Sequence, residues 1–151
     1  MRKGKGSYQH KKIQGDIQIM LRKMGYIVII ESSLDGRNAD LVIQNPQTLE
    51  TTIIEIELHK NYAHAIQSIK SDLRFCNKVI ILCGNKTILR ALIKLSREFD
   101  RKDRKKIHFV LVNRHFDFIR TLFQNKNNKK THNKTQNKIQ IKKEGPCTIV
   151  N

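Results

Sequence analysis

The chain has 151 residues, of which 38% are hydrophobic, so it can bury one core of about 120 residues but not two. Thirty Lys and Arg against thirteen Asp and Glu give a formal net charge of +17, which makes polyanions, and nucleic acid above all, the expected partners. The longest apolar runs, residues 27–30 and 79–83, are far too short to span a bilayer. We therefore expect one domain and no membrane partner.

The amino terminus is basic but leads into no apolar segment, so we expect no secretion signal and a cytoplasmic protein. The small size and the Lys, Ile and Asn bias fit a prokaryotic or viral origin. Cys76, Cys83 and Cys147 form no CxxC pair, and the first two are expected to be small buried hydrophobes. The histidines lack the spacing of a structural zinc site.

The first predicted element is a helix over residues 8–24, with Ile13, Ile17 and Leu21 at helical spacing and Gly25 after its end. Three β-branched runs follow and are expected to form strands of one sheet. They cover residues 26–30, 40–43 and 51–58, with turn-rich segments at 32–38 and 45–47.

The second half alternates helices and strands. The predicted elements are a helix over 61–75, a strand over 78–83, a helix from the Asn85 cap to 99, a strand over 107–112 and a short helix over 114–123. The near-continuous apolar run at 78–83 indicates a strand covered on both faces, as in a parallel pair. The order is αβββαβαβα, in one domain over residues 1–123. Residues 124–151 lack apolar periodicity and set only Glu144 against seven lysines, which predicts a disordered basic tail.

Three carboxylates lie inside the predicted apolar strands: Asp40, Glu55 and Glu57. An acid in such a run is costly to bury, so it calls for a partner. Glu55 and Glu57 are two residues apart and share a strand face, and a hairpin-like pairing would bring Asp40 beside Glu55. Hard oxygen ligands suit Mg²⁺ or Mn²⁺. The alternative is a solvated strand face whose acids balance the lysines.

Over residues 8–112, the helix, the three strands, Asp40, the acidic pair and the next helix resemble the PD-(D/E)xK nuclease superfamily. Its members include restriction endonucleases, Holliday-junction resolvases and RecB-type nucleases. The resemblance implies a restriction-endonuclease-like αβββαβ core, a mixed sheet flanked by helices. It also implies that Asp40 and Glu55 bind one or two Mg²⁺ ions, and that the residue two beyond Glu55 helps to organise the attacking water.

That residue is usually lysine, and here it is Glu57. An ExE arrangement occurs in some members, in which Glu57 would ligate a second metal or accept a proton from metal-bound water. Lys60 would then fold back to provide the missing cation. The alternative is a degenerate site that binds DNA without cutting it. Gln14 stands where resolvase-like members often carry a metal-binding glutamate, and its amide is a weaker ligand.

A polar stripe on the predicted helix after the third strand would extend the acidic site. It comprises Lys60, His64, Gln67, Ser71 and Arg74, with Lys70 beside it. In similar nucleases a Gln or Lys from this helix contacts the phosphate or orients the nucleophile, which suggests Gln67 and Lys70. The alternative is the solvent face of an amphipathic helix.

The resemblance thus implies a Mg²⁺-dependent DNA endonuclease of restriction or resolvase type, acting as a homodimer on duplex or branched DNA. Its expected DNA-binding residues are Lys11, Lys12, Arg37, Lys70 and Arg74. Two other classes stay open: a catalytically inactive accessory protein that binds DNA through the same fold, and an RNA-binding or assembly factor. The aromatic content of 6% disfavours single-strand stacking platforms, so DNA is the preferred partner.

Overall fold

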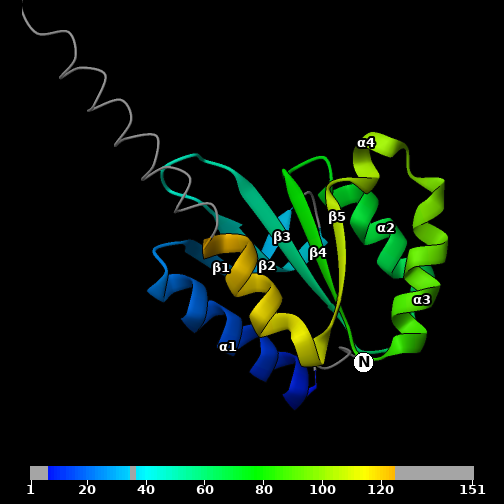
Figure 1. Ribbon diagram of the computed structural model, residues 1–151, viewed down its shortest axis with the longest axis horizontal. Coiled ribbons are helices and arrows are strands. Elements are labelled where there is room, and N and C mark those ends of the chain that lie inside the picture. Colours follow the sequence, from blue (N-terminus) through cyan, green and yellow to red (C-terminus); the bar gives the residue numbers. More distant parts are fainter. Residues whose placement is uncertain (1–6, 35–36, 125–151) are drawn as a thin grey trace, which may run out of the picture. The chain divides into compact units, whose positions relative to one another are not determined.

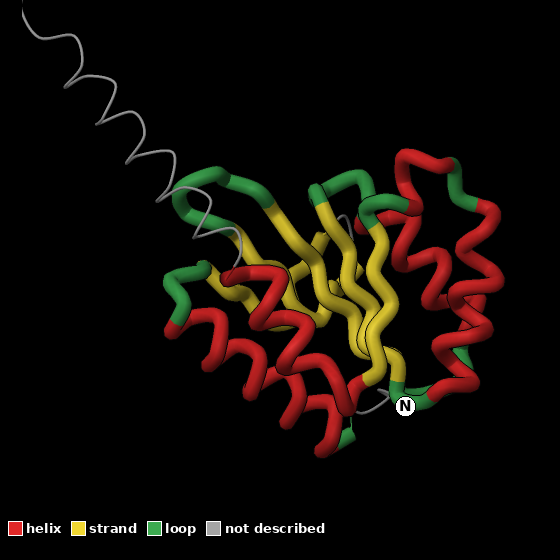
Figure 2. Tube along the Cα trace, viewed as in Figure 1, coloured by secondary structure: helices red, strands yellow, loops and turns green. Residues whose placement is uncertain are grey.

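The computed structural model describes residues 7–34 and 37–124. The chain divides into two compact units, Met1–Phe116 and Asp117–Asn151. The first unit holds a five-stranded sheet with helices on both faces (Figure 1; Figure 2). This confirms the α/β class, with a mixed sheet between helices, that the sequence predicts.

The sheet has the order β1-β2-β3-β4-β5. Its first three strands form an antiparallel meander, and β4 and β5 add to β3 in parallel. Helical crossovers are needed to join parallel strands, which explains why helices separate β3, β4 and β5 along the chain. The strands are β1 (Ile27–Leu34), β2 (Arg37–Gln44), β3 (Thr51–Glu57), β4 (Lys78–Cys83) and β5 (Ile107–Leu111).

Helix α1 (Tyr8–Lys23) covers one face of the sheet, over β1 and β2. The Ser7 hydroxyl accepts the His10 main-chain N–H at its start, and Gly25, with a φ of +87°, follows its end. Ile17 and Leu21 are fully buried, which confirms the apolar stripe that the spacing predicts.

Helices α2 (Tyr62–Asp72) and α3 (Lys86–Leu95) cover the other face, above β4 and β5. The helical spacing of four apolar residues predicts the buried stripe of α2, and it is confirmed, because all four pack in this core: Tyr62, Ile66, Ile69 and Leu73. In α3 the apolar spacing of the sequence predicts an inward position for Ile93, and this prediction is wrong, because Ile93 is 44% exposed and Ile88 is buried in its place. The Asn85 cap starts the helix so that Ile88 and Leu92, four residues apart, share the inner face.

Two stretches differ from the prediction. The segment 32–38 is not a long turn, because Ser32, Ser33 and Leu34 pair with the start of β2 and extend a hairpin. Polar residues at a strand end have low strand propensity, and only the cross-strand partner reveals the pairing. The helix expected up to residue 99 ends at Leu95, and two short helices follow: η1 (Ser96–Glu98) and α4 (Arg101–Arg104).

The carboxyl-terminal elements end with η2 (Val112–Arg114) and helical residues 115–124. Residues 125–151 lie outside the described residues, so the disorder of the tail stays a prediction, as does the domain boundary at residue 123. Cys83 is buried, Cys76 is half-buried, and both are free thiols. In the described part of the chain, no helix is long and apolar enough to cross a membrane.

The two Asn caps allow a matched test of local stability. The Asn85 side chain accepts the Ile88 N–H at 3.0 Å, whereas Asn61, at the same position of α2, makes no side-chain cap bond. We expect Asn85→Ala to lower the free energy of unfolding by about 1 kcal/mol and Asn61→Ala to lower it much less, as measured by urea denaturation. Equal losses would contradict the difference between the caps.

Candidate functional site

Asp40 is the fourth residue of β2, rather than its first, and lies where the sheet divides. The β2–β3 ladder ends at the pair Leu41–Ile54, whereas the β1–β2 ladder continues to Leu34–Arg37. At this point the Asp40 Oδ2 accepts the Ile56 N–H at 2.8 Å. We call this place, formed by Asp40 and Ile56, the strand fork. The carboxylate gives Ile56 the hydrogen bond that a main-chain carbonyl would otherwise supply.

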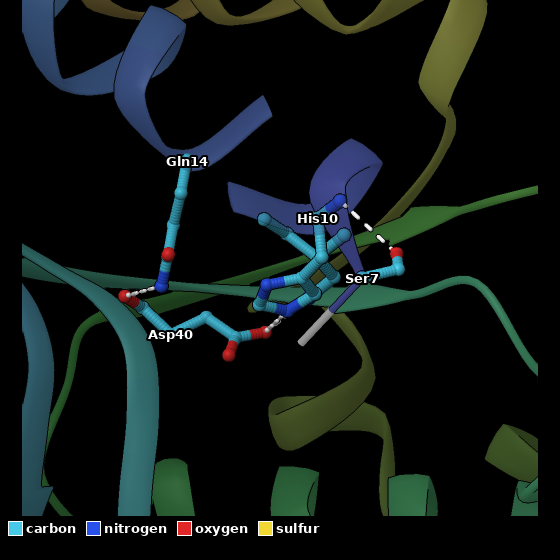
Figure 3. Close-up of polar contacts among 5 residues, drawn as sticks. Ser7, His10, Gln14 and Asp40 are labelled. Atoms are coloured by element: carbon cyan, nitrogen blue, oxygen red, sulfur yellow. Dashed lines mark hydrogen bonds and ion pairs between the residues drawn. The ribbon is translucent and has the colours of Figure 1, made fainter. Parts of the chain in front are cut away.

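The first turns of α1 hold Asp40 from a second side. The His10 Nε2 lies 3.1 Å from the Asp40 Oδ2, and the Gln14 side-chain amide donates to the Asp40 main-chain oxygen at 2.8 Å. Figure 3 shows both contacts, together with the Ser7 cap that fixes the start of the helix. His10 and Gln14 are four residues apart and therefore share one face of α1.

Glu31 brings a second acid to the strand fork. It lies between Ile30, which pairs with Leu41, and Ser32, which pairs with Ala39, and so stands opposite Asp40. Its φ is +49°, a left-handed conformation that costs a residue other than glycine about 1–2 kcal/mol. Backbone strain of this kind is often retained at functional sites.

Glu55 and Glu57 share one face of β3, as their spacing predicts. Glu55 pairs in register with Ile81 and Glu57 with Cys83, and both partners belong to the core beneath α2 and α3. Glu55 is only 7% exposed, and Glu57 is half-buried at the end of the strand. The Glu57 main-chain oxygen accepts the Gly84 N–H at 2.9 Å, which ties this end of β3 to β4.

These groups perturb one another's ionisation. Burial, and then the charge of Asp40, raise the pKa of Glu57 to about 7, while His10 acts in the opposite direction. The hydrogen bond to Asp40 raises the pKa of His10 against the effect of burial, and the charges of Glu31 and Glu57 add to the rise. Asp40, Glu57 and His10 are therefore close enough to form one electrostatic cluster, in which added positive charge stabilises the acids.

The fit of this cluster to a metal ion depends on how many ligands the ion needs from the protein. Within residues 7–34 and 37–124, no three His, Cys, Asp or Glu side chains gather as a metal-ligand group. Mg²⁺ is usually held by one or two carboxylates together with water and substrate phosphate. Among the described residues, the Asp40 carboxylate makes its two contacts through Oδ2. The nearby charge of Asp40 also raises the pKa of Glu57. The described carboxylates thus offer an incomplete set of ligands, and the Mg²⁺ or Mn²⁺ site stays a prediction.

The other predicted site residues lie at several places. Lys60 precedes α2 and Gln67 lies on it, both exposed. The Lys70 ammonium lies 3.4 Å from Glu98 and above the Phe99 ring. Lys70 therefore contacts η1, and the predicted extension of the acidic site along α2 stays a prediction.

The remaining predicted DNA-binding residues are Arg74, Lys11, Lys12 and Arg37. Arg74 donates to the Ser71 hydroxyl and lies over the Phe75 ring. Lys11 and Lys12 are exposed on α1, directly after His10. Arg37 begins β2, where it pairs with Leu34. Its side chain is not among those that the structure describes.

The sequence did not single out His10, whose imidazole the structure brings to Asp40. Two signals were present: a Ser7 cap three residues before it, and the i, i+4 spacing of His10 and Gln14 beside the buried stripe of α1. Neither signal identifies the partner, which comes from a strand about thirty residues away.

Comparisons with known proteins give little further information. No protein-family profile and no curated protein sequence matches the chain. A crystal structure titled as a protein of unknown function, AF1548, is similar at 12% identity and a TM-score of 0.42, over 68% of this chain. The match spans 57% of that protein's length.

The ion pair predicts a shifted titration of His10. We expect Asp40→Asn to lower the pKa of His10, because the hydrogen bond to the Asp40 carboxylate is the main cause of its rise. NMR titration of the imidazole signals measures this change. Asp103→Asn, at a carboxylate paired instead with Lys106, is the control and is expected to leave the His10 titration in place. A His10 pKa that is equal in wild type and Asp40→Asn would refute the pairing.

The raised pKa of Glu57 predicts that the stability of the fold depends on pH. Its pKa is about 7 in the folded protein against an ordinary value of 4.5, so the folded state binds the proton more tightly than the unfolded state. Stability should therefore fall as the pH rises from about 4.5 to about 7. We expect Glu57→Gln to reduce this fall in urea denaturation between pH 5 and pH 8, and Asp103→Asn to retain it. A fall of the same size in Glu57→Gln would assign the effect to other groups.

Proposed function

We propose that the chain is a metal-dependent DNA endonuclease that hydrolyses phosphodiester bonds, with a variant PD-(D/E)xK site and a restriction-endonuclease-like fold. The observation that supports this most is the convergence of Asp40, Glu57 and His10 at the strand fork, with Glu55 buried on the same strand face as Glu57. A cluster of perturbed ionisable groups is typical of catalytic sites.

Asp40, Glu55 and Glu57 are the residues that would hold Mg²⁺ or Mn²⁺. When bound, such an ion generates a hydroxide nucleophile from water and offsets charge on the phosphate. Three carboxylates would leave room for a substrate phosphate beside such an ion.

The chain's own residues have separate tasks in this proposal. His10 and the Ile56 N–H hold the Asp40 carboxylate by one oxygen. Glu57 would either join Asp40 and Glu55 as a ligand or accept the proton that the attacking water releases. Lys60 and Gln67 stay proposed as the groups that contact the phosphate or orient the nucleophile.

Charge supports DNA as the substrate. A net charge of +17 favours a polyanion, and the proposed phosphate contacts are Lys11, Lys12, Arg37, Lys70 and Arg74. Such contacts give salt-sensitive affinity that is largely independent of sequence. A single domain with one site cuts one strand, so we propose a homodimer acting on duplex or branched DNA. Free cysteines support a reducing compartment, the cytoplasm of a prokaryotic or virus-infected cell.

The test is cleavage of supercoiled plasmid and of a synthetic four-way junction with Mg²⁺ or Mn²⁺. We expect Asp40→Asn and Glu55→Gln to reduce cutting at least 100-fold, because each removes a carboxylate from the proposed metal site, while DNA binding is retained. Glu50→Gln, directly before the amino end of β3, should cut like wild type. Cutting by wild type that survives both site substitutions would refute the assignment of the site.

A non-cutting DNA-binding protein on the same fold is the second candidate. It is favoured by one observation: both contacts of the Asp40 Oδ2 are internal to the fold, so this carboxylate already has a structural role at the strand fork. Intact DNA with tight, salt-sensitive binding by wild type would select this candidate. In that case Asp40→Asn should lower stability and leave DNA affinity in place.

A further inference from the structure

A second charged surface lies at the amino ends of the parallel strands, at the other end of the sheet from the strand fork. We call residues 97–106, which comprise the end of η1, α4 and the turn into β5, the α4 segment. Glu57 ends β3 at the level of Cys83, and Glu55 lies two residues before it, at the level of Ile81. The α4 segment enters β5 at its amino end, where the Lys106 oxygen accepts the Val79 N–H. Figure 1 shows α4 at the end of the sheet away from the start of α1, which carries His10.

The cations of the α4 segment greatly outnumber the acids that are free to balance them. The segment contains six Lys and Arg and three acids. Each acid is engaged: Glu98 with Lys70 at 3.4 Å, Asp100 with the Asp103 N–H at 2.7 Å, and Asp103 with Lys106 at 3.6 Å.

Five cations of the segment are exposed and have no ion pair or hydrogen-bonded side-chain partner in the described residues: Arg97, Arg101, Lys102, Arg104 and Lys105. Crowding like charges on about ten residues is unfavourable without a counter-charge. A polyanion that lies across the α4 segment would supply this counter-charge.

The distance to the acids makes this surface separate from the candidate site. Ile56, at the strand fork, pairs with Leu82, and three residues of β4 separate this level from that of Val79, which at about 3.3 Å per residue is about 10 Å along the strand. The Debye length at physiological salt is about 8 Å. The cations of the α4 segment are therefore largely screened from the strand fork. They act on a ligand that lies at the amino end of β5.

The chemistry of the segment favours a duplex phosphate backbone over a single strand. Its one aromatic residue, Phe99, is 7% exposed, so no ring is available for base stacking. The exposed side chains of the segment are all polar, which disfavours insertion into a lipid surface. Ile93 and Leu95, both exposed, lie on the preceding α3, so a lipid surface remains an outcome that the test must separate.

We propose that the α4 segment is a second binding surface for duplex nucleic acid, distinct from the candidate site at the strand fork. It would let one molecule hold a second length of duplex, or a second arm of a branched substrate, while the first lies at the acids. The binding surface itself does not depend on the proposed nuclease activity.

The experiment compares two double variants of the full chain, Arg101→Gln/Arg104→Gln and Lys23→Gln/Arg90→Gln. Both remove two exposed cations, and the second pair lies on α1 and α3. Fluorescence anisotropy with a 30-base-pair duplex, at several salt concentrations without divalent metal, gives the slope of log Kd against log salt. We expect the first variant to lower this slope by about 2, since each lost phosphate contact is worth about 0.9, and the control to change it little. Thermal melting confirms that both variants fold.

Two outcomes would overturn the proposal. One is an equal change in both variants, which would indicate a general effect of net charge. The other is wild-type duplex binding by Arg101→Gln/Arg104→Gln with a loss of binding to vesicles that contain phosphatidylserine. Cleavage is measured in parallel with Asp40→Asn, so a chain that cuts no DNA would refute the nuclease while the slope still decides on the α4 segment.

Discussion

The hydrogen bond from the Ile56 N–H to the Asp40 carboxylate is the contact on which the candidate site depends. Beyond Leu41 and Ile54, β2 leaves β3 and continues only with β1. A strand that separates in this way leaves buried main-chain groups without partners, which is costly. Asp40 removes this cost at Ile56 with its side chain. Its other contacts follow from that position, because a carboxylate fixed between two strands lies within reach of the first turns of α1.

The charges of this protein act on two length scales. The chain as a whole is strongly positive, yet the pKa of Glu57 is raised to about 7 by burial and by Asp40. The exposed lysines and arginines do not offset this, because screening limits their effect to about 8 Å. A local group of acids thus persists inside a positive surface. Such an arrangement attracts a polyanion at long range and leaves a cation-accepting site at short range.

The sequence predicted what depends on local pattern. The alternation in β3 placed Glu55 and Glu57 on one face, and the apolar run at 78–83 identified a parallel strand with its bounds as observed. His10 and Glu31 were not predicted, because their significance depends on contacts with residues far along the chain. The left-handed conformation of Glu31 is likewise set by the point at which the hairpin leaves the sheet, which no propensity encodes. The paired acids were therefore visible in the sequence, and their histidine neighbour was not.

The topology explains why the acids and the α4 segment lie at opposite edges. Because β3, β4 and β5 are parallel, their carboxyl ends meet at one edge of the sheet, and each connection must return to the other edge before the next strand begins. Acids at the end of β3 and a basic connection that leads into β5 are therefore separated by the length of the strands. Any ligand that contacts both must extend along the sheet or bend around its edge. A long or branched polyanion meets this requirement, and a small anion does not.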